Sequence, residues 1–574
     1  FRAWRTFFER MASAGIVTLL FEDLQWADAG LLDFIDHLLE WSRGVPILIM
    51  TLARPELLDR RPEWGAGRRN FLALGLEPLD EDAMRDLLAG LVPGLPAATV
   101  RSIVARADGI PLYAVETIRM LVADGRLTEK DGRYEPVGEL GELAVPETLQ
   151  ALIAARLDGL APTDRALLQD AAVLGQSFTL AGLAAVSGED EAVLTGRLRD
   201  LSRADLVVQE VDPRSPERGM YTFVQALIRE VAYSTLAHRD RRARHLAAAR
   251  FFEGLGEDEL AGALASHYMA AWRAAPDGPE GDAIAIQARL ALVGAADRAM
   301  SLGSPEGAIG FLEQALTVTT DPAERAPILE RAGRAAGNAV QGDRAEAFFR
   351  EAIELRRSMG DVPGRFRAIA ALGASLIALR RLEVAATLLE PAIEEAEGVA
   401  DEADLATLIC GLARIRFSQD RVEEGLALID RGLPIAERHE LAELLTEALI
   451  TKGGLLTKAG RPVEGIALVE AARRLAVEHG FQAWEGRALV SLSLHVAIRD
   501  PRAAVEIERE AIGLARRIGR RDMELLLIGN AGEDSLRTGE WDFQATEFAS
   551  LDELDIEPSI RLPMESASNF IGLL

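Results

Sequence analysis

The sequence predicts a mostly α-helical protein that begins with part of an α/β domain and ends in a helical-repeat array. Three observations predict this class. Ala, Leu, Glu and Arg dominate the 574 residues, and aromatic residues make up only 5%. Near the N-terminus, short apolar runs alternate with helical patterns, as in a parallel α/β sheet. From about residue 291 onward, a turn followed by a helix recurs at intervals of 39 or 40 residues.

The composition limits the classes of function. There are 63 basic and 91 acidic residues, for a net charge of −28 that is spread along the chain. Such a charge argues against broad binding to nucleic acid or to anionic membranes. No apolar run approaches the roughly 20 residues of a membrane span, and no signal peptide precedes the first helix, so we expect a cytoplasmic protein. The single cysteine, Cys410, lies in an apolar helical pattern and is expected to be buried rather than reactive.

The α/β part is expected to span residues 1–79. A strand is predicted over 16–21, a helix over 31–41 and a second strand over 46–52. A third short strand is predicted over 71–76. Strand, helix and strand in this order predict parallel pairing, and ligands of such sheets bind at the carboxyl ends of the strands.

Charged side chains follow both of the first two predicted strands. Glu22 and Asp23 come directly after the first, and Arg54 follows the second. Carboxylates at this edge can hold Mg²⁺ directly or through water and polarise an attacking water, and an arginine beside them can reach a γ-phosphate. The alternative is that Glu22, Asp23 and Asp28 are helix-capping acids at a strand-to-helix turn.

The segment FEDLQWADAGLLDFIDHLLEWSRGVPILIMTLARPELLDRRPEW resembles the Walker B and sensor-1 region of signal-transduction ATPases with numerous domains (STAND ATPases). Within that class it is most similar to bacterial proteins that fuse an adenylate or guanylate cyclase, an AAA-type ATPase and tetratricopeptide repeats (TPRs); MalT-, AfsR- and LuxR-like regulators are more distant. The resemblance implies ATP or ADP with Mg²⁺ as cofactors, with Glu22 at the magnesium position, Asp23 as the second acid and Arg54 as sensor 1. The usual order is Asp then Glu, and the shorter second acid here fits slow, switch-like turnover.

No G-x-x-x-x-G-K-[ST] motif occurs in the sequence. That loop and its lysine supply most of the binding to the β- and γ-phosphates. The sequence also starts without Met and stops within an apolar phrase, NFIGLL. We therefore expect a fragment of a longer protein that by itself binds ATP weakly or not at all.

Residues 80–145 are expected to form a helical lid, with helices over 82–91, 97–107 and 112–121. Gly109 and Pro111 separate the last two helices, and a helix stop followed by a helix start accounts for this pair without any ligand. In the resembled family a Gly-x-Pro sequence marks the lid, with the proline near the adenine. The resemblance therefore makes Gly109 and Pro111 candidate cofactor-binding residues.

Residues 146–240 predict a winged helix, with helices over 162–174, 180–186 and 191–204 and a strand pair over 206–211 and 220–223. Gln225 stands where many members of the resembled family carry a histidine, and is the remaining candidate cofactor-binding residue. A basic cluster follows and invites a DNA-binding alternative, but acids are plentiful nearby and a solvated helix face is the favoured interpretation. The cluster comprises Arg239, Arg241, Arg242 and Arg244.

Residues 241–574 predict a TPR-like array. In each of six repeats, two small residues stand seven apart in the helix that follows the turn. Seven residues are two helical turns, so both face one neighbour and let two helices approach closely. We expect a protein partner in the groove of the array; the acids of the array are interpreted mostly as a solvated face, and a basic or amphipathic segment is one candidate partner. The pairs are Ala308/Ala315, Ala345/Ala352, Ala385/Ala392, Gly425/Gly432, Gly465/Ala472 and Ala504/Ala511.

The leading hypothesis is a fragment of an ATP-dependent signal-transduction regulator, in which an ATPase switch is coupled to a partner-binding array. By the resemblance, an intramolecular cyclase or other effector domain outside this sequence would supply the output. Two alternatives stay open: a LuxR- or MalT-like transcriptional regulator, and a TPR scaffold with a degenerate ATPase.

Overall fold

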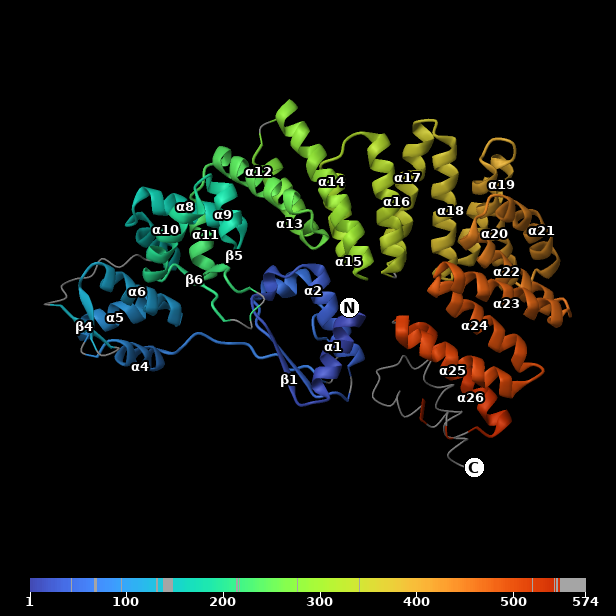
Figure 1. The fold of residues 1–574 in the computed structure, drawn as a ribbon, viewed down its shortest axis with the longest axis horizontal. Helices are drawn as coiled ribbons and strands as arrows, with labels where there is room; N and C mark the ends of the chain where they lie inside the picture. The colour runs from blue at the N-terminus through green and yellow to red at the C-terminus, as the bar shows by residue number, and fades with distance from the viewer. Residues whose placement is uncertain are drawn as a thin grey trace. The chain divides into compact units, whose positions relative to one another are not determined.

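The computed structural model describes residues 1–42, 44–66, 70–93, 95–130, 133–137, 148–212, 215, 217–275, 277–339, 341–518 and 520–540, together with 542, 546 and 547. Helices predominate throughout (Figure 1). The chain divides into two compact units: Phe1–Leu57 together with Val293–Leu574, and Leu58–Leu292. Among the described residues, no helix combines the length and the apolar character that a membrane crossing requires.

The N-terminal segment contains the predicted parallel strand pair. Strand β1 pairs with β2 in parallel, from Val17 opposite Ile47 to Phe21 opposite Thr51. Helix α1 packs on both strands, and α2 connects them, as a parallel crossover requires. The elements are α1 (Arg2–Ala12), β1 (Val17–Phe21), the 3₁₀ helix η1 (Leu24–Trp26), α2 (Ala29–Trp41), β2 (Ile47–Thr51) and α3 (Glu56–Arg60).

The prediction of a third strand over 71–76 is wrong. These residues have no regular secondary structure, and Leu72, Leu74 and Leu76 are 77–94% exposed. An alternating apolar pattern forms a strand only where another strand accepts its hydrogen bonds, and within the described residues nothing pairs with this segment.

The second unit begins with three helices around an apolar core that includes Met84, Ile103 and Ile118. Asp80 caps the first of them, because its Oδ1 accepts a hydrogen bond from the Ala83 N–H at 2.7 Å. The predicted helices are present, and an antiparallel hairpin follows them. The elements are α4 (Glu81–Leu91), α5 (Ala97–Ala107), α6 (Pro111–Ala123), β3 (Leu127–Lys130) and β4 (Arg133–Pro136).

Helices and a small antiparallel sheet follow at the positions expected for a winged helix. The sheet has three strands in the order β5-β7-β6, whereas the sequence predicted two. The additional strand, β5, has only two residues, which is too short to leave a recognisable pattern in the sequence. The elements are α7 (Leu149–Asp158), α8 (Pro162–Leu174), β5 (Ser177–Phe178), α9 (Leu180–Ser187), α10 (Glu191–Arg203), β6 (Val207–Gln209), β7 (Tyr221–Phe223), α11 (Ala226–Ser234), α12 (His238–Leu255), η2 (Asp258–Leu260), α13 (Ala261–Arg273) and α14 (Pro279–Ser301).

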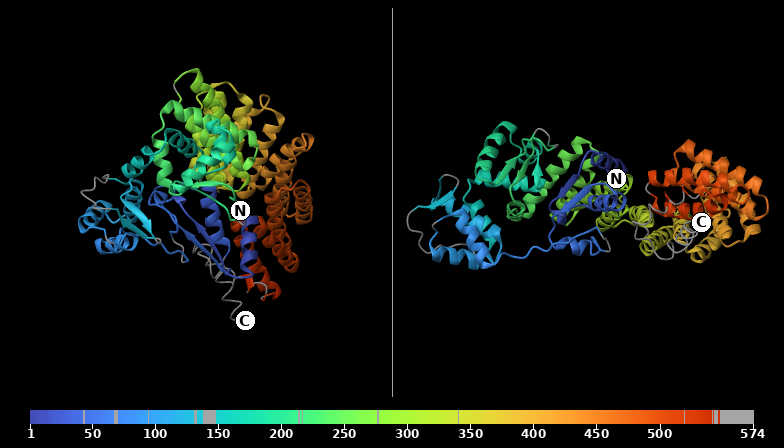
Figure 2. Two further views of the ribbon diagram at one scale, coloured as in Figure 1. Left: turned by 60° about the vertical axis from the view of Figure 1, so that its left-hand side comes forward. Right: turned by 90° about the horizontal axis from the view of Figure 1, so that it is seen from below.

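The remaining helices form a TPR-like solenoid of antiparallel hairpins (Figures 1 and 2). All twelve small residues of the predicted pairs are buried, which confirms that the helices approach closely where the small pairs face a neighbour. The helices are α15 (Pro305–Thr317), α16 (Pro322–Asn338), α17 (Gly342–Ser358), α18 (Val362–Ala378), α19 (Leu382–Ala396), α20 (Glu402–Ser418), α21 (Val422–Arg438), α22 (Ala442–Lys458), α23 (Pro462–His479), α24 (Gln482–Ala497), α25 (Pro501–Ile518) and α26 (Arg521–Thr538).

Candidate functional site

Glu22, Asp23 and Arg54 lie at one edge of the β1–β2 pair. The two strands are parallel, so their carboxyl ends meet there. The strand ladder continues past both ends, because the Leu52 N–H donates to the Phe21 carbonyl at 2.8 Å and the Leu24 N–H donates to the Leu52 carbonyl at 3.0 Å. The backbone around the two acids is therefore tied to the backbone that leads to Arg54.

Gln25 joins the second acid to this arginine. Its side chain is 6% exposed, and its Nε2 donates to Asp23 Oδ1 at 2.8 Å. The same side chain accepts a hydrogen bond through Oε1 from the backbone N–H of Arg54 at 3.1 Å. One buried amide thus fixes the carboxylate relative to the segment after β2. Gln25 was not among the predicted site residues, although its position two residues after Asp23 was a signal.

Asp23 has φ 55° and ψ 38°, in the left-handed region that aspartate enters more readily than most residues. This conformation turns the chain sharply after Glu22. Glu22, Asp23 and Arg54 are all exposed, so solvent or a ligand can reach them. Their oxygen and guanidinium groups suit Mg²⁺ and phosphate respectively.

The helix-capping alternative is correct for Asp28. Its Oδ1 accepts a hydrogen bond from the Leu31 N–H at 2.7 Å and so caps α2. Asp23 precedes η1 but makes no capping bond to it with its side chain. The acids of this segment therefore divide into one structural cap and a second acid that is bound by Gln25.

Gly109 is required by the local backbone. Its φ is +73°, and a Cβ on it would lie 2.5 Å from Pro78 Cβ and 2.6 Å from the Leu79 carbonyl oxygen. The Leu79 N–H also donates to the Gly109 carbonyl at 2.8 Å. Pro111 is exposed at the start of α6, where it needs no N–H partner. The end of α5 near Gly109 and the start of α6 at Pro111 therefore account for both residues without a ligand.

Gln225 is held by a buried carboxylate. Its Nε2 donates to Oε1 of Glu116 at 2.7 Å, and Glu116, on α6, is only 1% exposed. Arg119 lies 2.8 Å and Arg156 lies 2.9 Å from the same carboxylate. Gln225 Oε1 is buried and accepts no hydrogen bond from the described residues. The cluster ties α6 to α7 and to the start of α11.

Glu116 was not among the predicted site residues. The signal for it was an acid that follows four apolar residues, LYAV, near the start of the predicted helix 112–121. Gln225 was singled out only through the resemblance, as a nucleotide-sensing position. In the structure its amide N–H is engaged by Glu116, which stands 109 residues away along the chain.

Most of the basic cluster on α12 makes contacts within the protein. Arg244 pairs with Asp170 at 2.5 Å, and Arg242 pairs with Glu280 at 3.3 Å. The guanidinium of Arg241 lies 4.9 Å from the centre of the Tyr233 ring. These contacts favour a structural role for the cluster over a free basic surface for DNA.

Two buried histidines lie on α12 and α13, His245 on the first and His267 on the second. His245 Nδ1 and His267 Nδ1 are 3.0 Å apart, so one ring donates and the other accepts. His245 Nε2 also bonds the Tyr233 hydroxyl at 2.8 Å. Burial chiefly lowers the pKa of His245 to about 3, with help from the neighbouring His267, and lowers the pKa of His267 to about 4. Both rings are neutral at pH 7.

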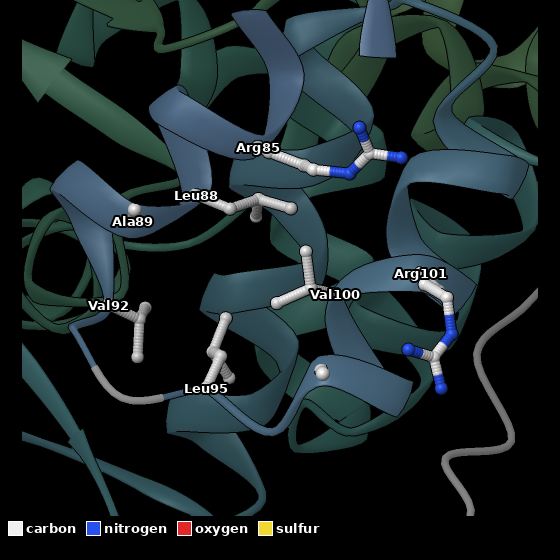
Figure 3. A pocket seen from close by; sticks show the side chains of 8 residues that line it. Arg85, Leu88, Ala89, Val92, Leu95, Val100 and Arg101 are labelled. Carbon is white, nitrogen blue, oxygen red and sulfur yellow. The ribbon is translucent and has the colours of Figure 1, made fainter. Parts of the chain in front are cut away.

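The parts of the chain that the structure describes contain no group of three or more His, Cys, Asp or Glu side chains that could hold a metal ion. A cavity of about 440 Å³ lies between α4 and α5, and none of the predicted site residues is among those that line it (Figure 3). Its walls are mostly apolar, with Arg85 and Arg101 among the lining side chains.

No protein-family model matches the sequence, and no curated protein matches it. Among solved structures, the chain is similar to a STAND protein with a tetratricopeptide repeat sensor from Pyrococcus horikoshii, at 12% identity and a TM-score of 0.37, over 99% of this chain and 84% of that one. It is also similar to the apo quorum sensor NprR from B. thuringiensis, at 13% identity and a TM-score of 0.41, over 63% and 99% of the two chains. TM-scores below 0.5 carry no functional inference.

Proposed function

We propose that this chain is part of an ATP-dependent signal-transduction regulator of the STAND type, in which a nucleotide switch is coupled to a TPR-like array that holds a partner protein. In this proposal Glu22 and Asp23 hold Mg²⁺ through water, and Asp23 acts on the attacking water. Arg54 contacts the γ-phosphate. The phosphate-binding loop and the output domain, a nucleotide cyclase by the resemblance, are supplied by sequence outside these residues.

The observation that carries the proposal is the Gln25 bridge. Two acids and an arginine at the carboxyl edge of a parallel strand pair form a nucleotide site only if they are held together. Gln25 connects the Asp23 carboxylate to the Arg54 backbone through bonds of 2.8 and 3.1 Å. A capping role would leave Asp23 bonded to a helix N-terminus, and it makes no such bond.

The test is nucleotide titration and hydrolysis by the natural full-length gene product. We expect Asp23→Asn to reduce hydrolysis at least tenfold with little change in ATP affinity, because the amide cannot polarise water or bind a cation as a carboxylate does. We expect Arg54→Ala to weaken ATP binding relative to ADP. Asp28→Asn, at the α2 cap, is the matched control and should retain activity. Equal affinity and equal hydrolysis in the wild type and both site variants would contradict the proposal.

The proposal also predicts how the 574-residue chain alone behaves toward ATP. Without a phosphate-binding loop it should not hydrolyse ATP above background. Robust magnesium-dependent ATP hydrolysis by this purified chain would contradict the proposal that Glu22 and Asp23 need a phosphate-binding loop outside these residues.

A further inference from the structure

The six repeats share one buried core position. It lies between the two small residues of each predicted pair, four residues after the first and three before the second. Because positions three and four apart lie on one helix face, this side chain packs on the same side of the helix as the small pair. The sixth repeat has Glu508 there, which is 1% exposed. The other five have large apolar residues that are at most 1% exposed: Leu312, Phe349, Leu389, Ile429 and Val469.

From the second repeat onward, this core residue faces a small residue of the preceding helix. A Cβ on Gly333 would lie 2.7 Å from Phe349 Cδ2, and a Cβ on Gly453 would lie 2.5 Å from Val469 Cγ2. The facing position recurs every 40 residues, and on α24 it is Ser493, which is 0% exposed. In the last of these hairpins a carboxyl group thus takes the place of an apolar side chain, and a hydroxyl group faces it. The facing series is Gly333, Gly373, Ala413, Gly453 and Ser493.

The carboxyl group of Glu508 has no hydrogen-bond partner among the described residues. Both of its oxygens are fully buried, and neither accepts a hydrogen bond from that part of the chain. The Ser493 hydroxyl donates to the Val490 carbonyl at 3.1 Å instead. Burying an ionised carboxylate without a partner is strongly unfavourable, so such a group keeps its proton.

The side chains of α26 near Glu508 make its ionisation still less favourable. Asp534 is 5% exposed, and its carboxylate already pairs with Arg537 at 3.1 Å. Burial chiefly raises the pKa of Glu508, to about 8, and the negative charges of Asp534 and Glu533 raise it further, while Ser493 opposes the shift. The helix that packs on Glu508 therefore supplies negative charge rather than a counter-ion.

The other titratable groups close by do not neutralise Glu508 either. Arg509, the next residue on α25, pairs with Glu540 at 3.3 Å. Burial lowers the pKa of His495 on α24, so this ring is neutral at pH 7. Glu508 therefore remains buried because it carries a proton.

We propose that Glu508 makes the α24–α26 end of the array proton-dependent: α25 packs against α24 and α26 while the carboxyl group holds its proton, and ionisation loosens these contacts. This inference does not depend on nucleotide binding. The equivalent position is apolar in the five earlier repeats, so the response to pH is confined to this end of the described array. A rise in pH would thus change how many repeats are closed at one time.

The free energy of opening should fall as the pH rises. In the open state the carboxyl group of Glu508 is solvated and has a pKa near its ordinary value of 4.5. Between that value and about 8 the closed state keeps a proton that the open state releases, so each pH unit favours opening by about tenfold. Above about pH 8 both states are ionised, and the opening equilibrium should level off.

The experiment is hydrogen–deuterium exchange on the whole chain at pH 6, 7, 8 and 9, corrected for intrinsic rates. Peptides from α25 and α26 should lose protection by at least about tenfold between pH 6 and 8 and little more by pH 9, while α22 and α23 stay constant. Glu508→Gln cannot ionise, so its protection should not fall with pH and should exceed that of the wild type at pH 8 by about tenfold or more. Glu508→Leu restores the residue type of the earlier repeats and should behave in the same way.

The matched control is Glu510→Gln on the same helix. Glu510 is exposed and pairs with Arg473, so this variant also loses one carboxylate, but at the surface. It should keep the pH profile of the wild type, with a constant loss of protection below about fivefold. His495 titrates in all of these proteins, so comparing them at each pH removes its contribution.

Three results would overturn the proposal. The first is the same pH profile in the wild type and in Glu508→Gln. The second is lower protection of Glu508→Gln and Glu508→Leu than of the wild type at pH 8, because the carboxylate would then be stabilising. The third is protection of wild-type α25 and α26 at pH 8 by added K⁺, Mg²⁺ or Ca²⁺, absent in Glu508→Gln, because Glu508 would then hold a cation in place of its proton. None of these results bears on the Asp23 and Arg54 experiments, so the two proposals fail separately.

Discussion

Replacement of Glu116 by alanine should destabilise the second unit locally and strongly. Glu116 is 1% exposed and accepts hydrogen bonds from Arg119, Arg156 and Gln225. A hydrogen bond to a charged group contributes about 1.5–3 kcal/mol, but the three share one carboxylate and are not additive. Removing one partner of a buried ion pair costs about 3–5 kcal/mol, because the remaining charge is left without compensation. Arg156, whose side chain is 12% exposed, would be that charge.

The assay is hydrogen–deuterium exchange followed by mass spectrometry, because a chain of several units does not unfold in one step. We expect peptides from α6, α7 and the start of α11 to lose protection corresponding to at least 2 kcal/mol of local opening free energy, while α22 and α23 are unchanged. Glu116→Gln should lose less, since the amide still fills the space and accepts hydrogen bonds.

The matched control is Asp82→Ala on α4. Asp82 pairs with Arg85 at 2.7 Å, but its side chain is 92% exposed, so the loss should stay below about 1 kcal/mol. A double-mutant cycle with Arg156→Ala then isolates the pair, and we expect a coupling energy of about 1–3 kcal/mol. A Glu116→Ala effect no larger than that of Asp82→Ala would refute the reasoning, because the carboxylate would then not hold the three elements together.

Three further predictions concern the repeats and the buried titratable groups. Gly453→Ala should destabilise the array by about 1–3 kcal/mol in urea denaturation, because the new Cβ would lie 2.7 Å from a carbonyl oxygen of α23; Gly310→Ala, with nothing within 4 Å, should stabilise it by about 0.5–1 kcal/mol. The pKa values of His245 and His267 are lowered from 6.5 to about 3 and about 4 in the fold, so the unfolded chain takes up protons first as the pH falls. The free energy of unfolding should therefore be highest above pH 6.5 and decrease as the pH falls toward 4. Unchanged exchange protection of α12 and α13 at pH 4.5, after correction for intrinsic rates, would contradict this. Cys410 is 1% exposed and burial raises the pKa of its thiol to about 12, so a thiol reagent should label it only after denaturation.

The sequence predicts the helices because apolar residues recur along them with helical spacing. It predicts the array because the turn and the helix that follows it recur every 39 or 40 residues. The small residue pairs even predict where helices touch: a Cβ on Gly465 would lie 2.5 Å from the Gly453 carbonyl oxygen. The segment 71–76 shows the limit. Its apolar alternation satisfies the local rule for a strand, but a strand also needs a partner elsewhere in the chain, which local pattern does not encode.

The same distinction applies to the candidate site. Placing Glu22, Asp23 and Arg54 at one edge required only that two neighbouring strands run parallel, and the sequence order predicts this. The Gln25 bridge depends on the direction of a side chain after a left-handed residue, and the Glu116–Gln225 bond joins residues 109 positions apart. Neither leaves a periodic signal.

Net charge is a poor guide to the partner of this array, because a sum over 574 residues does not say which face carries which sign. The acidic total makes a basic or amphipathic segment one candidate for the groove. In the structure many acids of the array pair with arginines of neighbouring helices, as Glu397 does with Arg431 and Glu395 with Arg365. Much of the negative charge on these helices is therefore balanced locally by arginines of the next helix, and the net charge of −28 does not describe any one face. The sign of the charge that a partner segment must carry depends on the side chains that line the groove, and not on the sum over the chain.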